Sequence, residues 1–125
     1  LGHDFCLISL SDNLKPWAII EKRLEHAAAA DLVMAFYNPI SKARPWQLGS
    51  ALDIVRQQRT PQTLVVLGRD IGRPGETLRT LTLGELTPEM VDMRTLVIIG
   101  SSQTCRFPRA EGGEWVYTPR SYPQE

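Results

Sequence analysis

The sequence predicts an α/β fold, a single layered domain with a mixed and mostly parallel sheet. Short apolar runs alternate with two amphipathic stretches in the order strand, helix, strand, helix, strand, and further strands follow. The chain has 125 residues, which is enough for one domain with a buried core and too few for two. We therefore expect residues 1–125 to form one domain.

The first half of the chain predicts two strands and two helices. A strand is expected at 5–10, where Phe-Cys-Leu-Ile-Ser-Leu forms a continuous apolar run. A helix at 16–29 opens with proline, whose missing N–H is not needed in the first turn, and has apolar residues at helical spacing. The same pattern predicts a strand at 31–37 and a helix at 45–59. Right-handed crossovers would place both helices on the same side of the sheet.

The second half predicts more strands and fewer helices. The expected elements are a strand at 63–67, a more exposed and antiparallel strand at 76–83, a short helix or turn at 84–90, and a core strand at 95–99. A loop with three glycines lies at 68–75. In the remaining segment, the apolar residues 115–117 either add an edge strand or pack across the domain.

Composition narrows the class of protein. Hydrophobic residues make up 42% and charged residues 22%, a balance typical of soluble globular proteins. The 14 basic and 14 acidic residues cancel, which argues against nucleic acid as the main partner. No apolar run approaches the roughly 20 residues of a membrane span. Cys6 and Cys105 lie in strand-like runs, so we expect buried free thiols and a cytoplasmic protein.

The chain begins with Leu1 and shows no signal-peptide pattern, so we expect it to be part of a longer protein.

Polar residues follow three of the predicted strands. They form the segments Ser9-Leu10-Ser11-Asp12, Tyr37-Asn38-Pro39 and Gly68-Arg69-Asp70. If these strands run in parallel, all three segments open at one edge of the sheet, where α/β proteins bind ligands. Each segment alone is better explained by ordinary turn and cap residues, and the three together favour a binding site.

Several basic residues lie in or near these loops, and guanidinium groups suit carboxylates and phosphates, although a solvated charge is the default for each one singly. They are Lys42, Arg44, Arg69, Arg73 and Arg79.

Common catalytic motifs are missing from the sequence. It contains no P-loop, no G-x-G-x-x-G after a strand and no G-x-S-x-G elbow. His3 and His26 have no paired ligands, so no metal site is expected. Asp12 is a candidate general base, although a lone Asp before a helix is more often a cap or turn residue.

Five segments together resemble one family closely. They are His3-Asp4-Phe5-Cys6, Ser9-Leu10-Ser11-Asp12 followed by Pro16-Trp17, Tyr37-Asn38-Pro39-x-Ser41 with Arg44-Pro45-Trp46-Gln47, Val97-Ile98-Ile99-Gly100-x-Ser102-x-Thr104, and Tyr117-Thr118-Pro119-Arg120-x-Tyr122. The family is the precorrin-3B C17-methyltransferases of cobalamin biosynthesis, which are tetrapyrrole methylases. The resemblance spans nearly the whole chain. It implies that this chain is the C-terminal domain of a two-domain enzyme, without the N-terminal domain.

The resemblance also implies an activity. It predicts an S-adenosylmethionine-dependent C-methyltransferase that methylates precorrin-3B, or its cobalt analogue, at C17 with ring contraction. The intact enzyme is expected to be a cytoplasmic homodimer, and this domain alone is expected to be inactive. Two alternatives stay open. One is a related tetrapyrrole methylase acting on another ring carbon, and the other is a non-catalytic α/β module for ligand binding or assembly.

Site residues follow from the same resemblance, residue by residue. Those matched to cofactor binding are Phe36, Tyr37, Asn38, Gly68, Arg69, Asp70, Met93 and Thr95. Those expected to face the substrate are Ser9, Ser11, Asp12, Lys42 and Arg44. No residue stands out as the acid or base that ring contraction requires.

Overall fold

The computed structural model describes residues 4–12, 15–40, 45–108 and 114–119. Its elements are β1 (Phe5–Ser9), α1 (Trp17–Ala29), β2 (Val33–Tyr37), α2 (Gln47–Arg56), β3 (Leu64–Arg69), β4 (Thr77–Thr82), the 3-10 helix η1 (Pro88–Met90), β5 (Thr95–Ile99), β6 (Cys105–Pro108) and β7 (Glu114–Tyr117). Each predicted strand and helix is present within a few residues of its expected bounds. The apolar residues near the end form β7, which pairs with β6 in a separate antiparallel hairpin that was not predicted.

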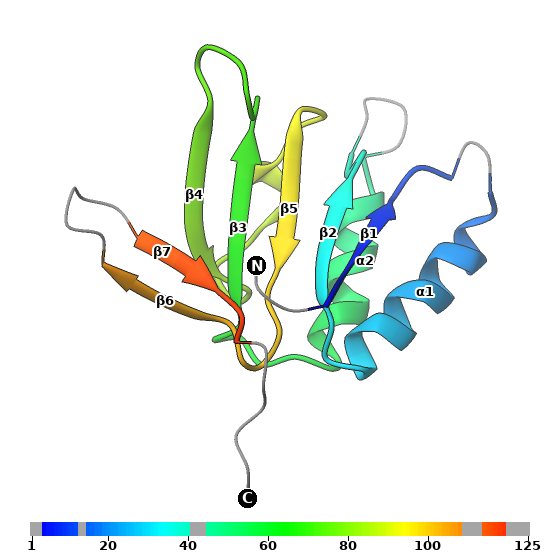
Figure 1. Cartoon of the computed structure of the whole chain (residues 1–125). Coiled ribbons are helices and arrows are strands. Elements are labelled where there is room, and N and C mark those ends of the chain that lie inside the picture. The colour runs from blue at the N-terminus through cyan, green and yellow to red at the C-terminus, as the bar shows by residue number, and fades with distance from the viewer. Residues whose placement is uncertain (1–3, 13–14, 41–44, 109–113, 120–125) are drawn as a thin grey trace, which may run out of the picture.

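The main sheet has five strands in the order β1-β2-β5-β3-β4 (Figure 1). The α/β class and the mixed sheet are confirmed, but the expectation of mostly parallel pairing is wrong. Only β1 and β2 pair in parallel, while β2–β5, β5–β3 and β3–β4 are antiparallel. For β3 and β4 the reason lies in the connection, because a parallel pair needs a long crossover and only a short loop joins these two strands.

Strand direction nevertheless brings three strand ends together. Both β2 and β3 run antiparallel to β5, and β1 runs parallel to β2. The carboxyl ends of β1, β2 and β3 therefore lie at the same edge, at the top of Figure 1, together with the beginning of β5. We call this the carboxyl edge. The prediction that three polar segments share one edge is confirmed, although an antiparallel strand lies between two of them.

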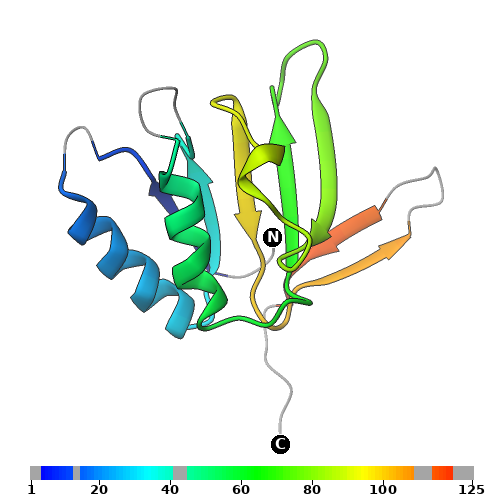
Figure 2. The ribbon, with the colours of Figure 1, turned by 180° about the vertical axis from the view of Figure 1, so that it is seen from behind.

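Both helices cover one face of the sheet, as predicted. They lie behind the sheet in Figure 1 and in front of it in Figure 2. The apolar stripes predicted for the helices are buried, with Ile20, Leu24, Ala27 and Ala28 in α1 and Leu48, Ala51, Leu52 and Val55 in α2. They pack against alternate strand residues such as Met34 and Phe36 to form the core. Alternation follows from the two-residue period of a strand.

A buried arginine closes the opposite end of the sheet. The Arg59 side chain is 2% exposed. Its guanidinium donates hydrogen bonds to the carbonyl oxygens of Gly100 at 2.6 Å and Leu32 at 2.5 Å. Its Nε lies 3.9 Å from Oδ1 of Asp31, and the Asp31 carboxylate also accepts hydrogen bonds from the backbone N–H and the hydroxyl of Ser102. The charge is tolerated in the interior because it is paired and hydrogen-bonded.

The two cysteines differ in exposure, and both are free thiols. Cys6 in β1 is partly buried, and burial raises the pKa of its thiol. Cys105 is exposed, so the expectation that both are buried is wrong. Cys105 begins β6, and a two-stranded hairpin buries less surface than the five-stranded sheet. None of the described helices is both long and apolar enough to cross a membrane.

Candidate functional site

The first half of the carboxyl edge joins the ends of β1 and β2. Ser9 pairs with Tyr37 across the two strands. Asn38 has a φ of 50°, a left-handed conformation that asparagine adopts more readily than most residues. From there its Nδ2 donates a hydrogen bond to Oγ of Ser9 at 3.3 Å, and the backbone N–H of Ser11 donates to the same oxygen at 3.3 Å. We call Ser9, Ser11, Tyr37 and Asn38 the Tyr–Asn cluster.

Tyr37 remains available to a ligand in this cluster. Its side chain is 42% exposed, although the four residues before it in β2 are buried. Phe36 differs, because it is fully buried in the core between the sheet and the helices. Any contact between Phe36 and a cofactor would therefore come from its backbone.

Asp12 is tied to the start of α2. The Gln47 side chain donates a hydrogen bond from Nε2 to Oδ1 of Asp12 at 3.0 Å. The N-cap of α1 is Pro16, with no side-chain cap hydrogen bond. Gln47 is 2% exposed and was not predicted as a site residue. Its signal in the sequence is a polar residue one helical turn before Ala51, in line with the apolar stripe of α2.

The second half of the edge joins the end of β3 to the start of β5 through charged groups. Nε of Arg69 donates to Oδ2 of Asp92 at 2.6 Å. The other carboxylate oxygen of Asp92 accepts the backbone N–H of Arg94 at 2.9 Å and the hydroxyl of Thr95 at 3.0 Å. Asp70 has a φ of 53°, and its carboxylate lies 3.5 Å from Nη1 of Arg69 and 3.4 Å from Nε of Arg94. We call Arg69, Asp70, Asp92, Arg94 and Thr95 the Arg–Asp cluster.

The pKa values in the Arg–Asp cluster favour permanent charges. The hydrogen bond from Arg69 lowers the pKa of Asp92, and the hydrogen bonds from Arg94 and Thr95 act in the same direction. The hydrogen bond to Asp92 in turn raises the pKa of Arg69. Both groups therefore stay ionised at neutral pH, and this pair is suited to binding and positioning rather than to proton transfer.

A small polar pocket opens beside this cluster. Its volume is about 280 Å³, and its lining residues are Asp70, Ile71, Arg73, Met93 and Arg94. Close packing shapes the neighbouring strand end, since a Cβ on Gly68 would lie 2.8 Å from Cδ1 of Ile71. The pocket thus combines one carboxylate, two guanidinium groups and two apolar side chains.

Most predicted site residues lie along this edge. The Tyr–Asn cluster unites two predicted cofactor residues with two predicted substrate residues, and the Arg–Asp cluster and its pocket unite Arg69, Asp70, Met93 and Thr95. Gly68 lies next to them in β3, against the side chain of Ile71. Lys42 and Arg44 lie outside the described residues. Asp92 was missed, and Arg94 was included only through the predicted contact segment 93–95. Their signal is Asp-Met-Arg-Thr directly before a strand, where aspartate often caps a turn. Within the described ranges, no group of three His, Cys, Asp or Glu residues could hold a metal ion.

Comparisons with known proteins show which sequences and structures this chain is similar to. No protein-family model matches the chain. A precorrin-3B C(17)-methyltransferase of Sinorhizobium is 53% identical over 98% of this chain and 48% of its own length. The cobalamin biosynthesis protein CobIJ of Mycobacterium tuberculosis is 48% identical over 99% of this chain and 25% of its own length. A probable cobalt-factor III C(17)-methyltransferase of Salmonella typhimurium is 43% identical over 98% of this chain and 48% of its own length.

The fold agrees as well. The crystal structure of the methyltransferase CobJ superposes with a TM-score of 0.87 and 50% identity, over 95% of this chain and 48% of that one. The chain thus spans about half the length of the methyltransferase from Sinorhizobium and of CobJ. The resemblance seen in the sequence is confirmed: over nearly its whole length, this chain is homologous to about half of a precorrin-3B C17-methyltransferase.

Proposed function

We propose that this chain forms the C-terminal half of an S-adenosylmethionine-dependent methyltransferase of cobalamin biosynthesis. The intact enzyme methylates precorrin-3B, or its cobalt-containing analogue, at C17 with ring contraction. The observation that carries the proposal is the carboxyl edge, where two polar clusters lie side by side in a chain 53% identical to such an enzyme. The proposal includes a cytoplasmic homodimer.

The polar groups of the edge fit the cofactor. S-adenosylmethionine combines a sulfonium cation and an amino-acid group with a ribose diol and an adenine, so it needs hydrogen-bond donors, acceptors and an aromatic or apolar surface. The Asn38 amide and the exposed Tyr37 ring offer these at one end of the edge. At the other end of the edge, the Asp70 carboxylate offers hydrogen-bond acceptors and the Met93 side chain offers an apolar surface. The site is therefore spread over three strand ends.

Methyl transfer mainly requires that the reacting groups are held in the correct orientation. When bound, the cofactor supplies a methyl group that a ring carbon attacks in line, forming a carbon–carbon bond while the carbon–sulfur electrons stay on sulfur. Charge becomes dispersed, so orientation is the main requirement. The ionised Arg69–Asp92 pair holds the end of β3 against the start of β5, and this chain thereby supplies a rigid wall of the site.

Arginines beside the pocket are proposed partners for the carboxylate side chains of the tetrapyrrole. Arg73 and Arg94 line the pocket, and guanidinium groups bind carboxylates through paired hydrogen bonds. Lys42 and Arg44, outside the described residues, keep the same predicted role. The other wall of the site would come from the half of the relatives that this chain does not cover.

Calorimetric titration with S-adenosylhomocysteine tests the proposal. The chain would be titrated alone and as a fusion with the uncovered half of the Sinorhizobium methyltransferase. We expect clear binding to the fusion and at least tenfold weaker binding to the chain alone, because half of the contacts are absent. A folded fusion that does not bind would contradict the proposal. Equal binding to both proteins would place the whole site in this chain.

A further inference from the structure

A groove runs between the edge strand β1 and helix α1, at one side of the main sheet (Figure 1). Its volume is about 670 Å³, compared with about 280 Å³ for the pocket beside the Arg–Asp cluster. Ile8 and Ala27 form its buried floor. The other lining residues are Cys6, Leu7, Ile19, Lys22, Arg23, His26, Ala30 and Leu32. We call it the β1–α1 groove. None of these residues belongs to the Tyr–Asn or the Arg–Asp cluster, so the groove is separate from the proposed cofactor site.

Three basic residues line the groove on the side of α1. They are Lys22, Arg23 and His26, which are all exposed, and we call them the basic rim. Glu21 and Glu25 fall on other faces of α1 because the helix repeats every 3.6 residues. Within the described ranges, no acidic residue lines the groove, and no hydrogen bond or ion pair neutralises a side chain of the basic rim. An apolar floor beside unpaired positive charge suits an anionic partner.

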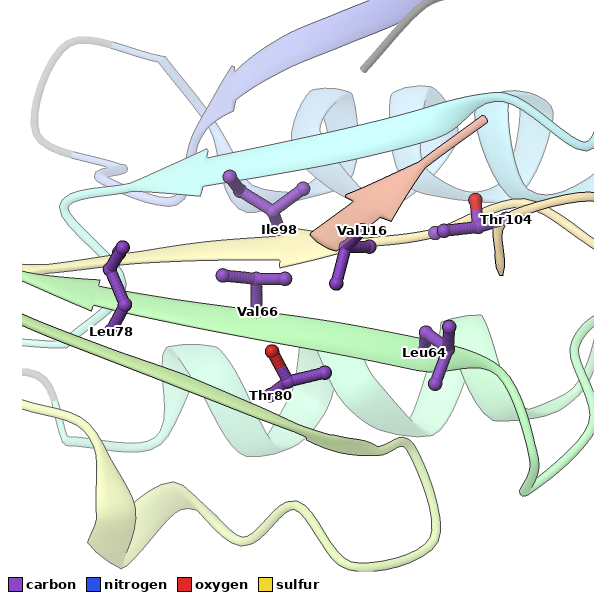
Figure 3. Close-up of a pocket in the computed structure, with 8 residues that line it drawn as sticks. Leu64, Val66, Leu78, Thr80, Ile98, Thr104 and Val116 are labelled. Atoms are coloured by element: carbon purple, nitrogen blue, oxygen red, sulfur yellow. The ribbon is translucent and has the colours of Figure 1, made fainter. Parts of the chain in front are cut away.

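The cavity between the main sheet and β7 lacks this charge (Figure 3). Its volume is about 210 Å³. Among the described residues, its lining includes no charged side chain, and its polar side chains are those of Thr80 and Thr104. It therefore has no group that would select a charged partner, whereas the β1–α1 groove has three.

Strand β1 also has an unpaired edge along the groove. Among the described strands it pairs only with β2. The N–H of Leu10 donates to the carbonyl of Tyr37 in the parallel pairing, and backbone groups alternate along a strand. The N–H and C=O groups of Phe5, Leu7 and Ser9 therefore point away from β2. The sequence of β1, Phe-Cys-Leu-Ile-Ser, contains neither proline nor a charged residue, and these are the residues that usually prevent a further strand from adding to an edge.

The dimensions of the groove fit an extended chain. From Ile19 to Ala30 the groove follows α1 for roughly 16 Å, and the five residues of β1 extend for roughly 17 Å. Lys22 and His26 lie about one turn apart, or roughly 6 Å along α1. Side chains two residues apart in a strand are separated by roughly 6.6 Å. Acidic side chains at alternate positions of an added strand would therefore reach both levels of the basic rim.

We propose that the edge of β1 and the β1–α1 groove bind an extended acidic segment of a partner protein, which adds to the main sheet as a further strand. Main-chain hydrogen bonds to β1 provide affinity, and the basic rim selects the side chains that enter the groove. The remaining side chains lie beside Phe5 and Leu7 on the other face of the sheet. A second copy of this chain is a poor occupant, because pairing of β1 with β1 brings two basic rims together. The inference is independent of the proposed function.

A fluorescence anisotropy titration with the peptide Glu-Val-Glu-Val-Glu, carrying an uncharged fluorophore, tests the proposal. At about 0.15 M salt, we expect saturable binding to the full chain below about 1 mM. Glu-Glu-Glu-Val-Val has the same composition and charge but cannot place its acidic residues on one side of a strand. It should bind about tenfold more weakly. Equal binding of both peptides, or no saturable binding of the first, would overturn the proposal.

Two pairs of variants locate the site. Arg23→Glu should weaken binding about tenfold, because a repulsion replaces an attraction. Arg79→Glu is the same substitution on β4, the other edge strand, and should bind like the wild type. Leu7→Pro removes an N–H that points away from β2, a position where an edge strand tolerates proline, and should abolish binding. Leu7→Thr keeps this N–H and should retain binding.

Far-ultraviolet circular dichroism confirms that each variant is folded, and Arg23→Glu decides the matter if Leu7→Pro does not fold. A folded Arg23→Glu that binds like the wild type overturns the proposal, and so does a loss seen in Arg79→Glu instead. The titration is repeated on the fusion with the uncovered half of the Sinorhizobium methyltransferase. Retained binding supports an external partner, whereas binding that the folded fusion loses assigns the edge to the other half and overturns the proposal. Titration with S-adenosylhomocysteine is a separate readout, so the two proposals can fail independently.

Discussion

The two ends of the sheet use the same residue types for different purposes. At one end Arg59, beside Asp31 with a φ of 61°, is buried and donates to backbone carbonyls. At the carboxyl edge Arg69, beside Asp70 with a φ of 53°, is 40% exposed and donates to a side-chain carboxylate. Each end thus has an arginine beside an aspartate whose backbone is left-handed. Burial and the kind of acceptor separate a structural clamp from a binding surface.

The comparison separates a residue that stabilises the fold from a residue that is exposed for binding. Arg59 connects the end of α1, the start of β2 and the end of β5 by their carbonyl groups, so its loss affects folding first. Arg69 connects only two segments through groups that water reaches, so its loss affects stability little. Mutations at the first end should therefore change stability, and mutations at the second should change binding.

The largest expected effect is that of Arg59→Met. Removing the guanidinium leaves the carbonyl oxygens of Gly100 and Leu32 without their donor and the Asp31 carboxylate without its neighbouring positive charge. Breaking a buried charged interaction in this way costs about 3–5 kcal/mol. Urea denaturation of the chain measures the loss in unfolding free energy. Arg59→Lys is the matched control and should lose less, because it keeps one charged donor. A loss below about 1 kcal/mol for Arg59→Met would remove the clamp role.

An intermediate effect is expected for Asn38→Ala, seen in binding rather than in folding. In the fusion protein it should weaken the binding of S-adenosylhomocysteine about tenfold, or by about 1.4 kcal/mol, which is near the upper end for one neutral hydrogen bond. Alanine with a positive φ also costs about 1 kcal/mol of stability. Asn38→Gly separates the two effects, since glycine tolerates the backbone but lacks the amide. Unchanged affinity in both variants would take Asn38 out of the site.

The smallest effect is expected for Asp92→Asn. The Arg69–Asp92 pair is largely exposed, so we expect a stability loss below about 1 kcal/mol at neutral pH. The Asp92 pKa is lower in the folded protein than in the unfolded chain. Its contribution is therefore complete above the ordinary aspartate pKa and disappears as the pH falls through the folded value, below about pH 4. Denaturation curves at several pH values should show the variant converging with the wild type in acid. A gap that persists there would contradict this account.

Local sequence patterns predicted where the helices and strands lie better than they predicted which strands pair with one another. The stripe Ile20, Leu24, Ala27 and Ala28 identifies α1 because an amphipathic helix repeats every 3.6 residues, and the structure buries the same positions. The sequence also predicted that the polar residues after β1, β2 and β3 lie at one edge of the sheet. Asp92 and Gln47 were missed, because each becomes part of the site only through a partner far away in sequence, Arg69 and Asp12.

By itself, the sequence determined the α/β class, the order of the elements, the two helical stripes and the resemblance to a methyltransferase family, since all of these are local or motif-based properties. Only the tertiary structure decided that β5 lies between β2 and β3, and that Arg59 is a buried clamp and Arg69 an exposed partner of Asp92. Strand pairing and burial depend on contacts between distant residues, and a one-dimensional pattern does not contain them.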